Sequence, residues 1–161
     1  MSIEVSEERP DSEAAQALIA ELEDVLTPLY PAESRHGYSV EKLIRQGVAF
    51  FIVRCNGEPA ACGGVQIYGT EYGELKRMYV RPAFRGTGLG KLMIAHIETY
   101  ALNRGVRLLR LETGVYQPEA IGLYERSGFH RIDPFGEYRE DPLSLFFEKS
   151  LPFVLEIEGP H

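Results

Sequence analysis

Cysteine is scarce in this sequence, since only Cys55 and Cys62 occur among 161 residues. They flank an Asn-Gly dipeptide at 56–57, which is typical of a tight β-hairpin turn. A two-residue turn there would place Cys55 opposite Glu58 and Cys62 opposite Phe51. Because a disulfide needs its two sulfur atoms on facing positions, we expect two reduced structural thiols and a cytoplasmic protein.

Long hydrophobic runs are also absent. No window approaches the roughly 18 consecutive apolar residues that indicate a transmembrane helix, and the acidic start lacks the pattern of a secretory signal. The sequence contains no repeat, low-complexity tract or interdomain linker, and its length matches one domain of ordinary size. We therefore expect a single domain over residues 1–161 that does not interact with a membrane.

Basic residues are outnumbered, because 17 Lys and Arg against 24 Asp and Glu give a net charge of −7. This balance argues against nucleic acid as a partner, since phosphate contacts need a basic surface. The charge is uneven, however, and residues 75–95 contain five basic residues and no acidic one. Such a division would let this segment bind an anionic ligand while the remaining surface attracts cations. With no Cys and His cluster at ligand spacing, we expect no metal.

The periodicity of apolar residues predicts both helices and strands. Helices are expected over 13–29 with Ser12 as its cap, from Ser39 to Arg45, from Leu89 to a C-terminal glycine at 105, and over 118–127. Strands are expected over 3–5, 48–53, 60–68, 74–80, 107–113, 129–132 and 145–151. Hairpins followed by a strand–helix–strand unit predict an α+β fold, with a mixed, mostly antiparallel, twisted sheet and helices on both faces. Residues 153–158 alternate like a strand, as an edge that pairs with a second subunit in a homodimer or as a surface tail.

A glycine-rich turn lies between the strand at 74–80 and the long helix. Gly86, Gly88 and Gly90 would let backbone N–H groups approach a ligand, and the helix N-terminus favours phosphate or pyrophosphate there. A Walker A loop would need glycine at Arg85, and a dinucleotide fingerprint would need it at Lys91, so both are excluded. The alternative without a ligand is a tight strand-to-helix turn.

The pattern that does fit is Arg-x-x-Gly-x-Gly, formed by Arg85, Gly88 and Gly90. It resembles the acyl-CoA signature of the GNAT superfamily of N-acetyltransferases. Residues 120–129 are similar to that family's late helix-and-strand motif, and together the matched stretches span roughly residues 74–132. The resemblance implies a GNAT-like acyl-CoA N-acyltransferase fold and an acetyl-CoA-dependent N-acetyltransferase. The enzyme would move the acetyl group directly to the primary amine of a small molecule or a peptide, within a ternary complex.

The resemblance also implies where the cofactor binds. The N–H groups of the turn would hold the pyrophosphate, and the backbone around Met78 and Val80 would pair with the pantetheine arm like an added strand. Gln117 stands where the family frequently has an asparagine that contacts the arm, so this contact stays open. The implied cofactor-binding residues are Met78, Tyr79, Val80, Arg85, Gly86, Thr87, Gly88, Leu89, Gly90, Lys91 and Gln117.

Acetyl transfer needs a neutral amine, and the leaving thiolate departs more easily once protonated. The resemblance places the family's general-acid tyrosine at Tyr124, whose alternative role is packing on its helix. A carboxylate at Glu74 resembles the family's usual base, although an exposed strand residue would look the same. Strand alternation predicts one shared face for Glu74, Lys76, Met78 and Val80.

Histidines and loops supply the remaining candidates. His36 is a rival base because the unperturbed pKa of a histidine suits proton transfer near neutral pH. The alternative is a plain surface position in its loop. His96 lies on an apolar stripe and is expected to be buried or at an interface. Residues 30–38 and 133–142 should frame the acceptor site. The second loop carries four carboxylates and two aromatics against one arginine, which suits a cationic amine or a solvated surface. A non-catalytic acyl-CoA-binding sensor or interaction module is the alternative function.

Overall fold

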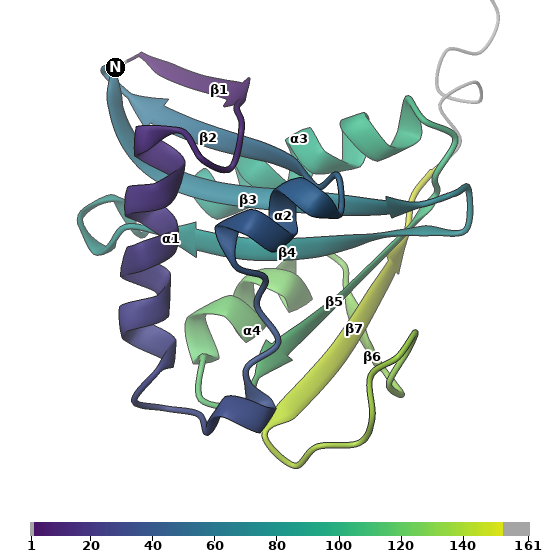
Figure 1. The fold of residues 1–161 in the computed structure, drawn as a ribbon. Helices are drawn as coiled ribbons and strands as arrows, with labels where there is room; N and C mark the ends of the chain where they lie inside the picture. Colours follow the sequence, from purple (N-terminus) through teal and green to yellow (C-terminus); the bar gives the residue numbers. More distant parts are fainter. Residues whose placement is uncertain (1, 153–161) are drawn as a thin grey trace, which may run out of the picture.

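The computed structural model describes residues 2–152 (Figure 1). Its helices are α1 (Glu13–Leu26), α2 (Val40–Arg45), α3 (Leu89–Leu102) and α4 (Pro118–Arg126), with short 3-10 turns at Ala32–Ser34 and Pro82–Phe84. Its strands are β1 (Ile3–Glu7), β2 (Ala49–Cys55), β3 (Glu58–Tyr68), β4 (Tyr72–Val80), β5 (Leu108–Gly114), β6 (His130–Ile132) and β7 (Ser144–Ser150). The strand predicted over 153–158 lies outside the described residues.

The described strands form one sheet in the order β1-β2-β3-β4-β5-β7-β6. Neighbouring strands are antiparallel except β4 and β5, which are parallel. Helices α1 and α2 cover one face, and α3 and α4 cover the other (Figure 1). The predicted α+β architecture is therefore confirmed. None of the described helices is long and apolar enough to cross a membrane.

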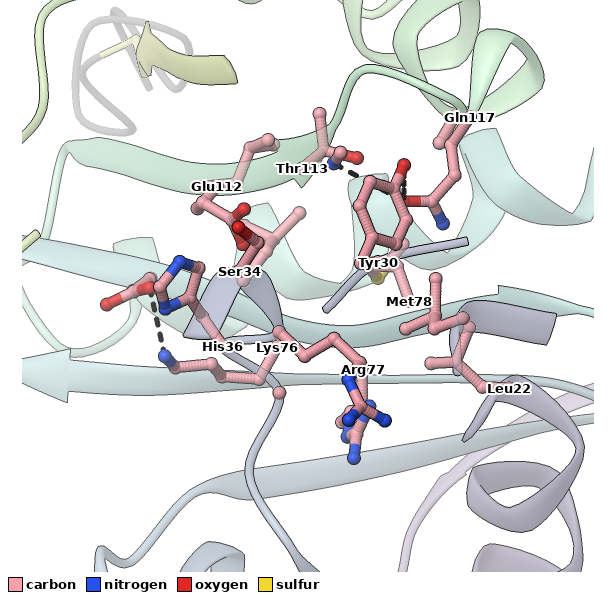
Figure 2. Close-up of a pocket in the computed structure, with 18 of the residues that line it drawn as sticks. Leu22, Tyr30, Ser34, His36, Lys76, Arg77, Met78, Glu112, Thr113 and Gln117 are labelled. Carbon is pink, nitrogen blue, oxygen red and sulfur yellow. Dashed lines mark hydrogen bonds and ion pairs between the residues drawn. The ribbon is translucent and has the colours of Figure 1, made fainter. Parts of the chain in front are cut away.

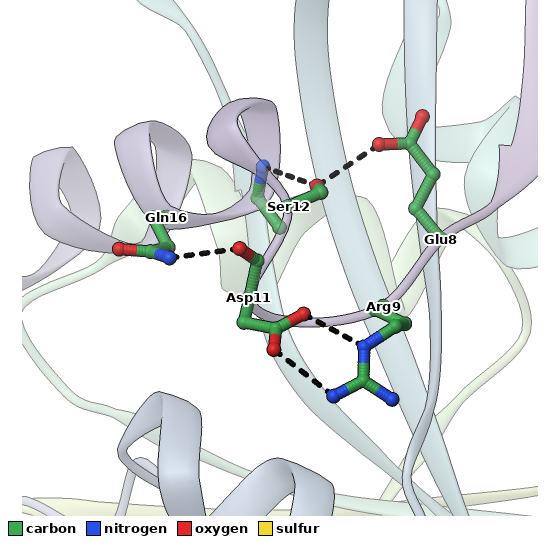
Figure 3. Close-up of polar contacts among 6 residues, drawn as sticks. Glu8, Arg9, Asp11, Ser12 and Gln16 are labelled. Carbon is green, nitrogen blue, oxygen red and sulfur yellow. Dashed lines mark hydrogen bonds and ion pairs between the residues drawn. The ribbon is translucent and has the colours of Figure 1, made fainter.

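The start of α1 confirms the predicted cap (Figure 3). The Ser12 hydroxyl accepts a hydrogen bond from the Ala15 N–H at 3.1 Å and donates to Glu8 Oε1 at 3.0 Å. Gln16 adds a bond to the carbonyl oxygen of Asp11 at 2.8 Å. A cap of this kind stabilises a helix by about 1 kcal/mol. The helix ends at Leu26, earlier than the predicted residue 29, because proline at 28 cannot continue it.

Each face of the sheet has its own apolar core. Leu18 and Leu22 of α1 pack with Leu43 of α2 and with Phe50 and Ile52 of β2 on one face. On the other face, α3 and α4 bury a larger cluster. Cys55 belongs to the second cluster and Cys62 to the first, and both are free thiols, as predicted. Burial of each large apolar side chain contributes roughly 1.5–3 kcal/mol.

The predicted partner of Cys62 was wrong. A register shift between Val53 and Arg54 places Cys62 opposite Ile52 instead of Phe51, while Cys55 does face Glu58. The physical reason is a β-bulge, because one extra residue in a strand changes every later pairing by one position.

A second irregularity, in β4, decides which side chains face the site. Arg77 has a left-handed backbone (φ 56°), and the pairing of β4 with β3 shifts at the same place. The predicted shared face of Glu74, Lys76, Met78 and Val80 is therefore wrong. Met78 and Val80 pack in the α3–α4 core, whereas Glu74 and Lys76 lie on the opposite face with Tyr138. The bulge interrupts the period-2 alternation on which the prediction rested.

Strands β4 and β5 separate soon after they meet. Their parallel pairing comprises only Gly73 with Leu109 and Glu74 with Arg110. Beyond Glu74, the β4 backbone has no β5 partner, although its other edge stays paired with β3 as far as Val80. The sheet thus opens between its two parallel strands, and an extended ligand can add to the free edge of β4 there.

Candidate active site

Three hollows follow one another through this opening. After the roles that the sequence analysis predicts for their residues, we call them the cofactor groove, about 680 Å³, the reaction cavity, about 100 Å³, and the acceptor cavity, about 670 Å³. The groove and the reaction cavity share Leu22, Met78, Gln117, Ala120 and Tyr124. The reaction cavity and the acceptor cavity share Arg35, His36, Gly37, Glu74, Lys76 and Tyr138. The reaction cavity, shown in Figure 2, therefore joins the other two.

The glycine turn forms one wall of the cofactor groove. Gly86 and Gly88 have positive φ angles of 79° and 85°, and nothing lies within 4 Å of where a Cβ would stand on either. Among the described hydrogen bonds, none is donated by the N–H groups of residues 86–91. A row of free N–H groups at the N-terminus of α3, beside open space, fits a pyrophosphate.

The structure gathers ten of the eleven predicted cofactor residues around this groove. The exception is Thr87, whose hydroxyl donates to the Phe84 carbonyl oxygen at 2.5 Å and which does not line the groove. Prediction from the sequence missed the opposite rim, where Val25 of α1, Leu29 in the turn after α1 and Tyr116 after β5 expose apolar surface. Their exposure is visible only once α1 lies across the opening.

The basic segment at 75–95 contributes less charge to the groove than its sequence indicates. Lys76, Arg77 and Arg81 each form an ion pair, with Glu74, Glu23 and Glu21 respectively. The two that line the groove without an ion-pair partner among the described residues are Arg85 and Lys91. Two cations beside free N–H groups still suit an anion.

Tyr124 lies where the cofactor groove meets the reaction cavity. Its ring is buried against Phe129 and Phe147, at centroid distances of 5.8 and 6.3 Å. Burial raises the pKa of its phenol, and the Glu112 carboxylate adds to the effect. Among the described residues, its hydroxyl has no hydrogen-bond partner. A neutral phenol with a free donor fits the predicted acid and combines it with the packing role.

Gln117 is held by protein groups on its oxygen side. Its Oε1 accepts hydrogen bonds from the Tyr30 hydroxyl and the Gly114 N–H, both at 3.3 Å. The Tyr30 hydroxyl in turn accepts from the Tyr116 N–H at 2.9 Å. Glycine at 114 makes this arrangement possible, because a Cβ there would lie 2.0 Å from the Tyr30 oxygen. The predicted contact of Gln117 with the cofactor stays a prediction, and it would use the amide nitrogen.

Glu74 is buried rather than exposed, with 3% of its surface accessible. Its Oε2 accepts hydrogen bonds from Lys76 Nζ at 2.9 Å and from the Tyr138 hydroxyl at 2.5 Å. Lys76 Nζ also lies 3.9 Å from the centroid of the Tyr38 ring. The carboxylate thus already neutralises a buried cation, which limits its use as the proton acceptor.

Glu112 of β5 is a second carboxyl in the reaction cavity, and the sequence analysis did not select it. It lies across the opening from β4 (Figure 2). Burial raises its pKa to about 7, even though the Ser144 hydroxyl donates to its Oε2 at 2.8 Å. Among the described residues, no cation forms an ion pair with it. Its one sequence signal is a carboxylate within the apolar strand 107–113, which does not show what faces it.

The histidines divide as their sequence positions indicated. His36 lines both the reaction cavity and the acceptor cavity, and desolvation lowers its pKa. Its ring meets the Tyr138 ring edge-on at 5.3 Å. His96, on α3, packs against Phe51 at a ring-centroid distance of 4.8 Å and lines none of the three hollows. His36 thus lies at the junction of the two cavities, whereas His96 packs against the sheet, away from all three hollows.

The acidic loop at 133–142 does not present its charge to the acceptor cavity. Of its four carboxylates, only Glu137 lines that cavity. Asp141 accepts from the Ser34 hydroxyl at 2.7 Å and from the Leu143 N–H at 2.9 Å. The loop contributes the rings of Phe135 and Tyr138 instead. In residues 2–152, no group of three or more His, Cys, Asp or Glu could hold a metal ion.

The sheet opens between two parallel strands, with a glycine turn suited to phosphate at one end and a neutral phenol at the junction. This arrangement is typical of an N-acetyltransferase that uses acyl-CoA. Comparison with known proteins agrees with this class. The chain belongs to the Acetyltransferase (GNAT) family, which it matches over residues 14–129. It is an N-acetyltransferase enzyme of that family.

Relatives match nearly the whole chain. The IAA acetyltransferase of Azospirillum brasilense is 43% identical over 152 residues, which cover 93% of this chain and 99% of that protein. A crystal structure of an acyl-CoA N-acyltransferase from Klebsiella pneumoniae subsp. pneumoniae has a TM-score of 0.78 at 34% identity, over 92% of this chain and 97% of that one. The PaiA N-acetyltransferase of Thermoplasma acidophilum, solved with coenzyme A, has a TM-score of 0.72 over 93% and 99%. At 20% identity it shows the fold alone.

Substitution of Gly88 tests the cofactor groove. Gly88→Ala should weaken acetyl-CoA binding at least tenfold by calorimetry, since an alanine resists the φ of 85° that aims the N–H groups. The strain should also cost about 1–2 kcal/mol of stability. Gly57→Ala is the matched control, with φ 83° and equally open space in the β2–β3 turn. It should lose similar stability and keep its affinity, and equal affinities in both variants would contradict the assignment.

Proposed function

We propose that this enzyme binds acetyl-CoA in the cofactor groove and transfers the acetyl group directly to a primary amine in the acceptor cavity. The observation that carries this proposal is the continuity of the three hollows, because the residues they share bring two substrates to one small cavity. Neither cysteine lines the reaction cavity, so its residues offer no thiol for an acyl-enzyme. Cys62 lines the cofactor groove, but burial raises the pKa of its thiol to about 12. These observations support direct transfer in a ternary complex.

Acetyl transfer forms a C–N bond and breaks the C–S bond of the thioester. Tyr124, between the groove and the reaction cavity, would protonate the leaving thiolate. The nitrogen loses a proton as the tetrahedral intermediate collapses, and this balances the proton that the phenol gives. The free β4 edge from Leu75 to Val80 would hold the pantetheine arm as an added strand.

The incoming amine must first lose the proton that a typical alkylamine carries at pH 7, with a pKa near ~10.4. We propose that Glu112 accepts this proton. Glu74, the predicted base, already accepts two hydrogen bonds and neutralises Lys76. Glu112 receives one bond, from Ser144, and its pKa of about 7 suits a base at neutral pH. Glu74 then acts as a positioning residue that holds Lys76 and Tyr138.

Two measurements on the wild-type protein test the proposed function. Acetyl-CoA at 100 times its Kd adds about 2.7 kcal/mol of stability, which should raise Tm by several degrees. Release of free thiol from acetyl-CoA should then require an amine from a mixed panel of polyamines, amino sugars, amino acids and peptides. Binding without turnover on any amine would support the acyl-CoA-binding sensor instead, and no thermal shift would exclude both. The cytoplasmic location and the homodimer stay predictions.

A further inference from the structure

The lining of the acceptor cavity indicates what kind of amine it takes. The cavity is lined by five aromatic rings from four segments of the chain, namely Tyr38, Tyr68, Tyr72, Phe135 and Tyr138. Several of these rings contact one another, with Tyr68 stacked on Tyr72 at 4.7 Å and Phe135 meeting Tyr72 and Tyr138 at 5.7 and 5.1 Å. A hollow of this size with aromatic walls favours a flat or bulky apolar body over a small hydrophilic amine.

The charges around these rings are mostly positive. Lys76 is neutralised by Glu74 at 2.9 Å, which leaves Arg35 and Lys42 as the lining cations without a carboxylate partner among the described residues. Lys42 Nζ lies 4.4 Å from the centroid of the Tyr38 ring. The acid that remains is Glu137, whose side chain is exposed on the loop. An anionic group on the ligand would therefore be attracted here.

Two buried polar atoms in this lining lack partners. Arg35 donates from one terminal nitrogen to the Thr27 hydroxyl at 3.1 Å, but its Nε is buried without an acceptor. Gln66 is 7% exposed and bonds to Gln46 through Nε2, while its Oε1 is buried without a donor. A buried polar atom without a partner costs about 1–3 kcal/mol. Such atoms beside a cavity indicate a polar ligand that completes them.

We infer that the acceptor is a primary amine that carries both an aromatic ring and a carboxylate, as aromatic amino acids do. We further infer that Arg35 and Lys42 bind this carboxylate. The inference rests on the proposed function and names its substrate class. The ring would lie among Tyr38, Tyr68, Tyr72 and Phe135, and the amine would reach the reaction cavity past Glu74 and Tyr138, which line both hollows. The cationic acceptor expected from the acidic loop gives way to one with an anionic group, because three of the four carboxylates of that loop do not line the cavity.

Matched pairs of amines test this substrate class. Phenylalanine, tyrosine and tryptophan would be compared with phenethylamine, tyramine and tryptamine, which lack only the carboxylate. The expected result is a kcat/KM at least tenfold higher for the amino acids, measured by thiol release and confirmed by mass spectrometry of the product. An equal or higher kcat/KM for the decarboxylated partners would overturn the inference.

Two variants place the carboxylate. Arg35→Met and Lys42→Met should each lower kcat/KM for the amino acids at least tenfold through KM, and leave the decarboxylated amines within twofold. Arg45→Met is the control, since Arg45 lies on the same helix as Lys42, is exposed and lines none of the hollows. A loss of activity common to all amines would mean a structural role and would overturn the carboxylate assignment.

The outcome separates this inference from the proposed function. The substrate class is overturned if only amines without a carboxylate are acetylated. It is also overturned if no aromatic amino acid is acetylated while acetyl-CoA still binds. In both cases the mixed panel of amines still tests whether the protein transfers an acetyl group. Absence of both acetyl-CoA binding and turnover would overturn the proposed function itself.

Discussion

Replacement of Glu112 by glutamine should give an enzyme that is more stable above pH 7 and at least about 100-fold slower. The loss in kcat follows from the proposed proton transfer, because an amide of nearly the same shape cannot accept the proton of the amine. Wild-type activity should rise with pH and level off above about 7, the pKa of Glu112. The variant should lack this step in its pH profile.

The expected gain in stability of Glu112→Gln depends on pH. Burial raises the folded-state pKa of Glu112 from 4.5 to about 7, so the stability that the protonated carboxyl contributes is present below about 4.5 and is lost as pH rises through about 7. Above pH 7, ionisation of the buried Glu112 carboxyl lowers the free energy of unfolding by roughly 3 kcal/mol at most. Glu112→Gln removes it and can keep the hydrogen bond from Ser144. Its Tm should therefore exceed that of wild type by about 5–10 °C at pH 8 and be unchanged at pH 4.

Glu74→Gln is the matched comparison, since the other carboxyl of the same cavity should behave in the opposite way. It would leave the buried Lys76 cation without its countercharge, which costs roughly 3–5 kcal/mol. Its Tm should fall at pH 8 where that of Glu112→Gln rises. If Glu112→Gln keeps wild-type kcat with every acceptor, Glu112 is not the base, and an unchanged Tm at pH 8 would contradict its raised pKa.

The Tyr124→Phe substitution, which removes only the phenolic oxygen, should lower kcat by roughly 10- to 100-fold. It should leave the Kd for acetyl-CoA within twofold. The phenylalanine ring keeps the contacts with Phe129 and Phe147. It loses the donor for a thiolate whose free pKa is near ~8.5. Since the wild-type hydroxyl has no partner among the described residues, stability should not fall. Stopped-flow thiol release and calorimetry measure the two quantities.

Tyr100→Phe is the control for this change. Tyr100, near the C-terminal end of α3, packs against Phe51 at a ring-centroid distance of 5.3 Å and lines none of the three hollows. Its variant should match wild type in kcat. Equal kcat in Tyr124→Phe and Tyr100→Phe would remove Tyr124 from the mechanism, whereas weaker acetyl-CoA binding in Tyr124→Phe would assign it to the cofactor groove.

Local sequence signals determined the elements of this fold well. Ser12 as a helix cap, the Asn-Gly turn at 56–57 and the glycine turn at 86–90 act over a few residues, and each lies where the sequence predicted it. The GNAT motifs added the element order and the family. Ten of the eleven cofactor residues that these signals predicted line the cofactor groove, because nine of the ten lie on one continuous strand–turn–helix segment.

The tertiary structure alone decided which groups meet at the reaction cavity. The bulge at Arg77 places Glu74 and Lys76 on the face opposite Met78, and no period-2 pattern contains it. Glu112 acquires a raised pKa only because β4 and β5 separate and the loops after α1 and β6 cover it. The sequence thus determined the fold and the cofactor turn through short-range backbone preferences. Charge, proton affinity and the lining of the acceptor cavity depend on desolvation and on contacts between distant segments, which only the folded chain creates.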